Sequence, residues 1–307
     1  MINRTLIRLK IVQLIYEYYQ NGNRSIEAVG KELMYSLSKA YELYNLLLCL
    51  MIDLTRYADE VINKQEEINR VTHANKEISH RLLENKFIAI LEKNNMLNQY
   101  REEKKLSWMD DKNYLKYLYD IIVQSEYYAD YLAPNEVTFD DDREFWRKVY
   151  KNIIMKDTEI DDIIEDMCIY WNDDKETVDT FVIKTIKRFT AESTEEQPLM
   201  PEFRDEEDKL FADRLLRRTI ENAEYYQSLI SQSAHNWELN RIAFMDLVIM
   251  QVAIAEILSF PEIPVSVTIN EYIELAKCYS TPKSHIYING IVDNVAKRLR
   301  NAGKLMK

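Results

Sequence analysis

One short segment near the end of the chain combines residue types that suit a phosphate and a base. Thr281-Pro282 has the pattern of a helix start, with an N-cap followed by proline in the first turn. Lys283, Ser284 and His285 then occupy a first turn whose backbone N–H groups and dipole attract anions. Tyr287 could stack an unpaired base. The segment predicts a contact with single-stranded RNA; the alternative is that Tyr287 lies in the core and Lys283 is merely solvated.

The opening segment offers a second group of cations. Arg4 and Arg8 share one face of a helix predicted over about residues 3–20, and no acid follows them before Glu17. Residues 1–10 carry three cations and no acid, and residues 283–307 carry six cations and one acid, in a chain of net charge −12. If the two ends meet in space, they form a basic footprint on an acidic body, which suits nucleic acid.

Metal and cofactor chemistry receive no support from the spacing of the cysteines and histidines. Cys49, Cys168 and Cys278 are far apart among apolar neighbours, which predicts three buried thiols, and the four histidines show no metal-ligand spacing with them. No apolar run approaches the roughly 18 residues of a membrane span, and the start lacks a signal-peptide pattern. We therefore expect a cytoplasmic protein without a metal site, a cofactor or a membrane contact.

The elements that position these residues are predicted to be helices. The chain has 4 glycines and 6 prolines in 307 residues, where average usage gives roughly 20 and about 15. Residues that make tight turns inexpensive are therefore almost absent, and strands need such turns. The sequence predicts an all-α fold.

The helical pattern divides the chain into five segments. They are an N-terminal helix in 1–25, a helical acidic insertion in 26–140, a second helical bundle in 141–190, a linker in 191–206 and a C-terminal helical bundle in 207–307. Residues 145–189 match 211–255 in apolar phase, and Trp171 falls on Trp237. This match predicts a duplicated bundle, although two helix pairs of similar length also align by chance.

The C-terminal bundle resembles the NusB family. Residues 263–293 read IPVSVTINEYIELAKCYSTPKSHIYINGIVD, close to the family's IP…INEA-ELAK…F-NG-LD. Residues 211–216 and 252–258 fall in step with this string, and Arg8, Val12-Gln13-Leu14 and Tyr16 resemble the family's opening helix. The resemblance implies a NusB-like helical bundle, here enlarged by about 180 residues between its matching ends.

The resemblance also implies a function and partners. NusB proteins pair with the ribosomal protein NusE, bind boxA RNA and nucleate an antitermination complex on the transcription elongation complex, without catalysing a reaction. Tyr287 matches the family's RNA-contacting aromatic, Arg4 and Arg8 match part of its arginine cluster, and Asp246 matches an acid near NusE. By analogy, a homodimer is also expected. Asn289-Gly290 is expected to let helices approach closely rather than to touch a ligand.

Two other functions remain open. NusB-like modules also begin some RNA methyltransferases, but such enzymes need a glycine-rich cofactor loop, and the four glycines form none. A helical protein–protein scaffold that has lost RNA binding is the stronger alternative, because Thr5, Leu6 and Ile7 stand where further arginines are expected. Fewer phosphate contacts would weaken RNA binding and its salt dependence.

Overall fold

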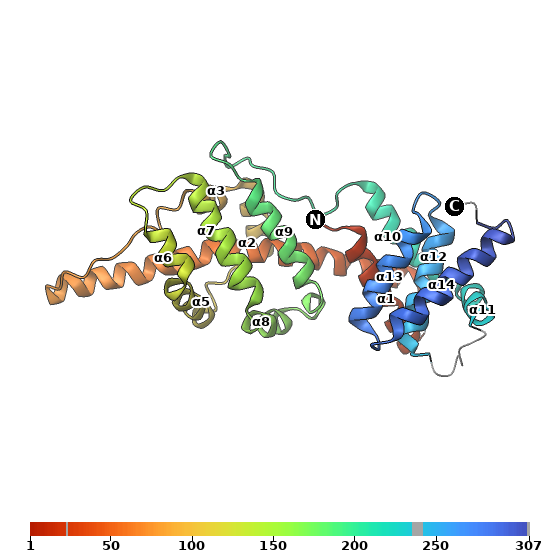
Figure 1. The fold of residues 1–307 in the computed structure, drawn as a ribbon. Coiled ribbons are helices and arrows are strands. Elements are labelled where there is room, and N and C mark those ends of the chain that lie inside the picture. Colours follow the sequence, from red (N-terminus) through yellow and green to blue (C-terminus); the bar gives the residue numbers. More distant parts are fainter. Residues whose placement is uncertain (23, 235–241, 306–307) are drawn as a thin grey trace. The chain divides into compact units, whose positions relative to one another are not determined.

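The computed structural model describes residues 1–22, 24–234 and 242–305, and this part of the chain is built from helices (Figure 1). Its single β-type pairing is an isolated bridge between Ile2 and Phe203. The predicted all-α class is therefore confirmed. None of the helices in these ranges is both long and apolar enough to cross a membrane.

The chain divides into two compact units. Residues 2–37 and 203–307 form one, called here the terminal unit, and residues 38–202 with Met1 form the other, the middle unit. The terminal unit contains α1 (Arg4–Asn21), the start of α2 (Ile26–Thr72), α10 (Glu206–Glu221), α11 (Ala223–Ser233), α12 (Phe244–Ser259), α13 (Val265–Tyr279) and α14 (Ser284–Asn301). The middle unit contains the rest of α2, α3 (Lys86–Lys93), α4 (Asn95–Lys104), α5 (Lys112–Gln124), α6 (Glu126–Leu132), α7 (Phe139–Asn152), η1 (Ile154–Lys156), α8 (Glu159–Met167), η2 (Ile169–Trp171) and α9 (Lys175–Arg188).

This division corrects two predicted boundaries. Residues 26–37 belong to the terminal unit rather than to an insertion, because α2 begins there before it continues into the middle unit. The boundary at 140/141 falls inside α7, where the buried Asp142 accepts hydrogen bonds from Tyr131 Oη at 2.6 Å and from the Lys86 backbone N–H at 2.8 Å. A domain boundary there would cut a buried polar network, so 38–140 and 141–190 form one unit.

The predicted linker at 191–206 is non-helical up to Asp205 but is not a free tether. Leu199 is buried, the backbone N–H of Asn95 donates to Glu195 O at 2.9 Å, and Asn94 Nδ2 donates to Gln197 O at 2.8 Å. These contacts hold residues 195–199 against the middle unit. The composition rich in Glu, Ser and Thr predicted the loss of helix but could not predict these long-range partners.

The predicted duplication stays a prediction. The two aligned segments have the same order of helices: α7, α8 and α9 in one, and α10, α11 and α12 in the other. In each segment the first and third helices pack together, α7 on α9 and α10 on α12. Trp237, the partner of Trp171 in the sequence match, lies outside the described residues.

Helix α12 is the centre of the terminal unit. It contacts α1, α10, α11, α13 and α14, and 12 of its 16 residues are buried. Apolar side chains on all of its sides explain this position, because a helix that is apolar all round is stable only when other elements surround it. Every polar side chain on α12 must therefore find its partner on a neighbouring helix.

Three buried polar side chains on α12 occur at five-residue spacing. A helix turns about 100° per residue, so five residues advance by about 140° and the three side chains point to three different sides. They are Asp246, Gln251 and Glu256. Gln251 Nε2 donates to Tyr19 Oη at 2.5 Å and to Thr219 O at 3.1 Å, which ties α12 to α1 and α10.

Candidate functional site

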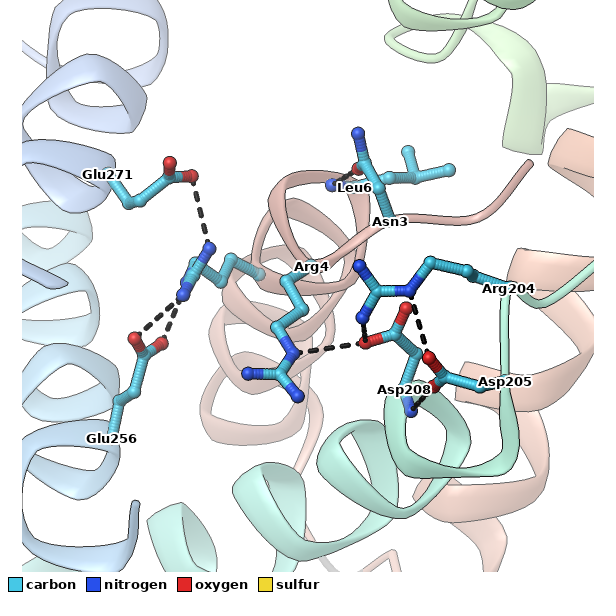
Figure 2. Close-up of polar contacts among 9 residues, drawn as sticks. Asn3, Arg4, Leu6, Arg204, Asp205, Asp208, Glu256 and Glu271 are labelled. Atoms are coloured by element: carbon cyan, nitrogen blue, oxygen red, sulfur yellow. Dashed lines mark hydrogen bonds and ion pairs between the residues drawn. The ribbon is translucent and has the colours of Figure 1, made fainter. Parts of the chain in front are cut away.

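Arg8 lies in a buried ion pair rather than on the surface. Its Nε and Nη2 donate to the two carboxylate oxygens of Glu256 at 2.7 and 2.8 Å, and Nη1 lies 3.1 Å from Glu271 Oε2 (Figure 2). Thr268 and Tyr272 donate their hydroxyls to Glu256, each at 2.9 Å. The pair and these hydroxyls join α1, α12 and α13.

The predicted RNA contact of Arg8 stays a prediction, and the structure gives this side chain a role inside the terminal unit. The Arg8 side chain is 4% exposed. Burial lowers the pKa of the guanidinium, but the hydrogen bonds and charge of Glu256 outweigh burial, so the pKa is raised and Arg8 stays charged. With its charge met by Glu256 and Glu271, Arg8 is placed to hold three helices together rather than to meet a phosphate.

Arg4 is paired with an acid, but part of its side chain remains exposed. Its Nε donates to Asp208 Oδ1 at 3.0 Å, its guanidinium lies 4.9 Å from the centre of the Phe211 ring, and its side chain is 27% exposed. Arg204 also reaches Asp208, at 3.3 Å, and donates to Asp205 at 2.9 Å (Figure 2). The sequence showed no acid near Arg4, because these acids lie about 200 residues further along the chain.

The last helix begins slightly later in the chain than the sequence predicted. Helix α14 begins at Ser284, and Thr281 and Pro282 form a turn before it, closed by the Ser284 backbone N–H to Thr281 O at 2.9 Å. Ser284 is fully buried, donates to Asp246 Oδ2 at 3.0 Å and has its Oγ 2.7 Å from Thr281 Oγ1. Its hydroxyl therefore bonds inside the terminal unit, and the RNA contact predicted for Ser284 stays a prediction.

Asp246 is likewise buried and does not form an outer surface. It accepts hydrogen bonds from Ser280 at 2.5 Å and from Ser284 at 3.0 Å, so it fastens the α13–α14 turn to the start of α12. Burial raises the pKa of Asp246, and the two serine hydrogen bonds offset only part of this effect. Its predicted contact with a partner protein stays a prediction; in the structure its hydrogen bonds lie within the terminal unit.

The raised pKa of Asp246 predicts a dependence of stability on pH. Folded Asp246 binds its proton at a higher pH than unfolded Asp, so its contribution to stability decreases as the pH rises above about 4. Asp246→Asn removes the buried charge and keeps a side chain that can bond both serines. We expect this variant to be more stable than the parent at neutral pH, with the gain shrinking towards about pH 4. Hydrogen exchange of α12 peptides in increasing urea across this pH range measures the difference within the terminal unit; a gain that grows on acidification would contradict it.

The other residues at the start of α14 remain on the surface. Lys283 is exposed, and His285 and Tyr287 are half-buried. Tyr287 Oη lies 3.0 Å from Ser284 Oγ, which anchors the hydroxyl end of the ring. Lys283, His285 and Tyr287 are called here the α14 surface.

Gly290 does not serve helix packing as expected. It is exposed within α14, and no atom lies within 4 Å of the place where a Cβ would stand. Glycine inside a helix costs about 0.5–1 kcal/mol relative to alanine. We therefore expect Gly290→Ala to raise the free energy of unfolding of the terminal unit by about that amount, measured by hydrogen exchange of α14 peptides in increasing urea. A loss of stability would mean that the helix backbone needs the glycine.

The α14 surface and the arginines lie near opposite ends of α12. Ser284 bonds Asp246 and Arg8 bonds Glu256, and these acids are ten residues apart on one helix. At a rise of 1.5 Å per residue this separation is about 15 Å along the axis. The two basic ends of the chain therefore enter the same unit without forming a single site.

An aromatic cluster beside Asp246 was missed in the sequence. Phe244 is 39% exposed, and its ring centre lies 5.3 Å from that of Tyr16 and 6.1 Å from that of Tyr19. The three rings are called here the Phe244 cluster. The sequence signal was present, since α1 carries tyrosines at 16 and 19, one turn apart. Only the packing of α1 against α12 brings Phe244 to them.

The cysteines differ from the expectation of three buried thiols. Cys49 is buried, and burial raises the pKa of its thiol to about 12. Cys168 is half-buried, and Cys278, on α13, is exposed. No group of three metal-ligating side chains occurs in the described ranges.

Comparison with known proteins places this geometry in a family. The family model described as NusB family matches residues 177–297. The transcription antitermination protein NusB of Thermodesulfovibrio yellowstonii is 38% identical over 117 residues, which cover 38% of this chain and 73% of that protein. The chain belongs to the NusB family. This confirms the family that residues 263–293 predicted.

Other NusB relatives match to a similar degree. The transcription antitermination protein NusB of Salinibacter ruber is 40% identical over 97 residues, covering 32% of this chain and 61% of the relative. That of Finegoldia magna is 44% identical over 92 residues, covering 30% and 67%. The chain spans between about half and two thirds of the first relatives it matches, from 47% to 66%. No solved structure gives a significant match.

The NusB match covers the α14 surface but not the opening helix. It begins in α9 and takes in α10 to α14. Most of the middle unit precedes it, as in an enlarged form of the family. Arg4 and Arg8, in α1, lie outside the matched range. Of the predicted RNA-binding residues, those of the α14 surface therefore both lie within the family match and are at least partly accessible to solvent.

Proposed function

We propose that the chain is a non-catalytic transcription antitermination factor of the cytoplasm that binds boxA-type single-stranded RNA together with NusE. The observation that carries the proposal is the NusB family match across α14, where Lys283, His285 and Tyr287 remain exposed or half-buried. Relatives in the family bear the name transcription antitermination protein. The elongation complex is the expected larger partner.

In this proposal the side chains at the start of α14 make the RNA contacts. The backbone N–H groups of Ser284 and Ile286 already donate to Thr281 O and Lys283 O, at 2.9 and 3.1 Å. Phosphate binding therefore depends on the Lys283 ammonium and the His285 ring, together with the helix dipole. Tyr287 supplies the stacking surface for one base.

The Phe244 cluster is the proposed contact for NusE. Asp246 is enclosed, whereas the adjacent Phe244 ring is 39% exposed and flanked by Tyr16 and Tyr19. Exposed aromatic side chains are enriched where protein interfaces are strongest. Phe244→Ala is the corresponding variant for a binding assay with NusE.

The test is RNA binding with and without NusE at two salt concentrations. A labelled boxA-type RNA should bind more tightly with NusE present, and the affinity should fall with added salt. Lys283→Gln should weaken binding and reduce the salt slope by about 0.7. Lys277→Gln is the matched control, because Lys277 is exposed but paired with Glu274 at 2.6 Å. Equal binding by all three proteins would rule out the α14 surface as the RNA site.

A second candidate, a protein–protein scaffold, is favoured by one observation. Arg8 is enclosed by carboxylates and Arg4 is partly neutralised by Asp208, so the cations of α1 contribute little to binding a phosphate. A scaffold would form the complex with NusE but would show no RNA affinity above background. That single outcome distinguishes the two functions.

Asp208 provides a prediction that concerns Arg4. Asp208→Asn keeps a hydrogen-bond acceptor for Arg4 and Arg204 but removes the negative charge beside them. If RNA passes α1, the freed cations should raise RNA affinity a few-fold and steepen its salt dependence. Fluorescence anisotropy at two salt concentrations measures both. Unchanged affinity would place the RNA away from Arg4.

A further inference from the structure

A groove distinct from the α14 surface lies between α11 and α14 in the terminal unit, away from α1. It has a volume of about 500 Å³. Its walls combine apolar side chains, Leu229 and Leu299 among them, with one tyrosine, Tyr225, and two cations, Arg298 and Lys304. Tyr225 is 40% exposed, and Arg298 and Lys304 are exposed. The groove therefore presents a ring and two positive charges to solvent.

Among the residues that the structure describes, no carboxylate forms an ion pair with Arg298 or Lys304. Arg298 donates to Ser233 Oγ at 3.1 Å and to Gln232 Oε1 at 2.9 Å, both uncharged groups. Lys304 Nζ lies 5.9 Å from the centre of the Tyr225 ring. None of the described residues that line this groove is acidic. By contrast, a groove of about 600 Å³ beside α13 and α14 includes Glu262 and Asp293. Of these two grooves, the α11–α14 groove is therefore better suited to an anion.

The groove and the α14 surface lie along one stripe of α14. Tyr287, Asn294 and Arg298 are spaced by seven and four residues, so they lie in one stripe on the helix. Asn294 is exposed, and the only acid of α14, Asp293, is 2.6 Å from Lys297 on an adjoining face. From Tyr287 to Arg298 the stripe is about 16 Å long at a rise of 1.5 Å per residue.

We propose that this groove is a second contact surface for single-stranded RNA, reached by the strand that stacks on Tyr287. Tyr225 would stack a further base, and Arg298 and Lys304 would hold the flanking phosphates. The proposal rests on the proposed function. Aromatic rings alternating with cations along one path are the arrangement that binds single strands without regard to sequence. An acidic peptide would use the cations but would gain little from two separated tyrosines, so RNA is the better occupant.

The experiment compares two labelled RNAs on the full-length chain with NusE. One contains the boxA-type element alone, and the other extends it by about ten nucleotides, in separate versions on the 5′ and 3′ sides. We expect one extension to tighten binding roughly tenfold. Tyr225→Leu and the double variant Arg298→Gln with Lys304→Gln should remove that gain and leave the short RNA unaffected. The double variant should also lower the salt slope by about 1.4 for the extended RNA.

Lys297→Gln is the matched control. It removes one positive charge next to Arg298, at the end of α14 where cations also favour the helix dipole, but Lys297 is paired with Asp293 outside the groove. Thermal melts of each variant separate a loss of binding from a loss of folding. The extended RNA should bind Lys297→Gln as it binds the parent.

The other possible results contradict either the groove as an RNA surface or the proposed function. If short and extended RNAs bind alike, or if Lys297→Gln costs as much as the double variant, the groove is not an RNA surface. If a short polyglutamate peptide binds the groove while the extension has no effect, the groove binds protein instead. If neither RNA binds, the proposed function itself fails, and the second surface fails with it.

Discussion

Arg8→Ala is expected to destabilise the terminal unit by about 3–5 kcal/mol. The substitution removes two charge-assisted hydrogen bonds from Glu256 and leaves this fully buried carboxylate with the hydroxyls of Thr268 and Tyr272 as its donors. An uncompensated charge in the interior costs several kcal/mol, which is a large part of the stability of an ordinary domain.

Hydrogen-exchange mass spectrometry of α12 peptides in increasing urea measures this effect within the terminal unit. A signal from the whole chain would mix the unfolding of the two units. Glu271→Gln is the control, because Glu271 meets the same guanidinium but is 31% exposed, so its loss should cost under about 1 kcal/mol. The double variant Arg8→Met with Glu256→Leu should be less destabilised than Arg8→Ala. If Arg8→Ala is as stable as the parent, Arg8 is not in the buried pair, and its assignment to RNA returns.

Tyr287→Ala is expected to have the largest effect on RNA binding. Loss of one base–aromatic stack costs about 1–3 kcal/mol, which corresponds to a roughly 5- to 150-fold rise in Kd. The ring is half-buried and held at its hydroxyl by Ser284, so little of its stacking energy is lost in ordering the side chain. Anisotropy of a labelled boxA-type RNA with NusE present measures the change.

Two further variants show whether the loss of ring stacking causes the fall in RNA affinity. Tyr287→Phe keeps the ring and should retain most of the affinity, although its contact with Ser284 is lost. Tyr35→Ala removes another tyrosine of the terminal unit, 51% exposed on α2, and should leave Kd unchanged. Equal losses from Tyr287→Phe and Tyr287→Ala would mean that the hydroxyl, and not the ring, makes the contact.

Local information in the sequence was sufficient for the fold class and the family. Helix formation depends on neighbours three and four residues away, so the scarcity of glycine and proline and the apolar spacing predicted the all-α class. The string at residues 263–293 identified the family because many of its positions keep their spacing. Lys283 is exposed and Tyr287 is half-buried, and the RNA contacts that the sequence predicted for them stay predictions.

The partners of the charged residues depended on the tertiary structure. Arg8 and Glu256 are 248 positions apart, and no local pattern distinguishes an arginine that meets a phosphate from one that meets a buried carboxylate. The sequence predicted Asp246 to be a surface acid. Its helix is apolar on every side, and only the packing of the neighbouring helices shows that all of those sides are covered. The sequence by itself determined that the fold is helical and which family the chain resembles. Only the tertiary structure decided which charges face water, because the cost of burying a charge is offset by groups that are distant in the chain and adjacent in space.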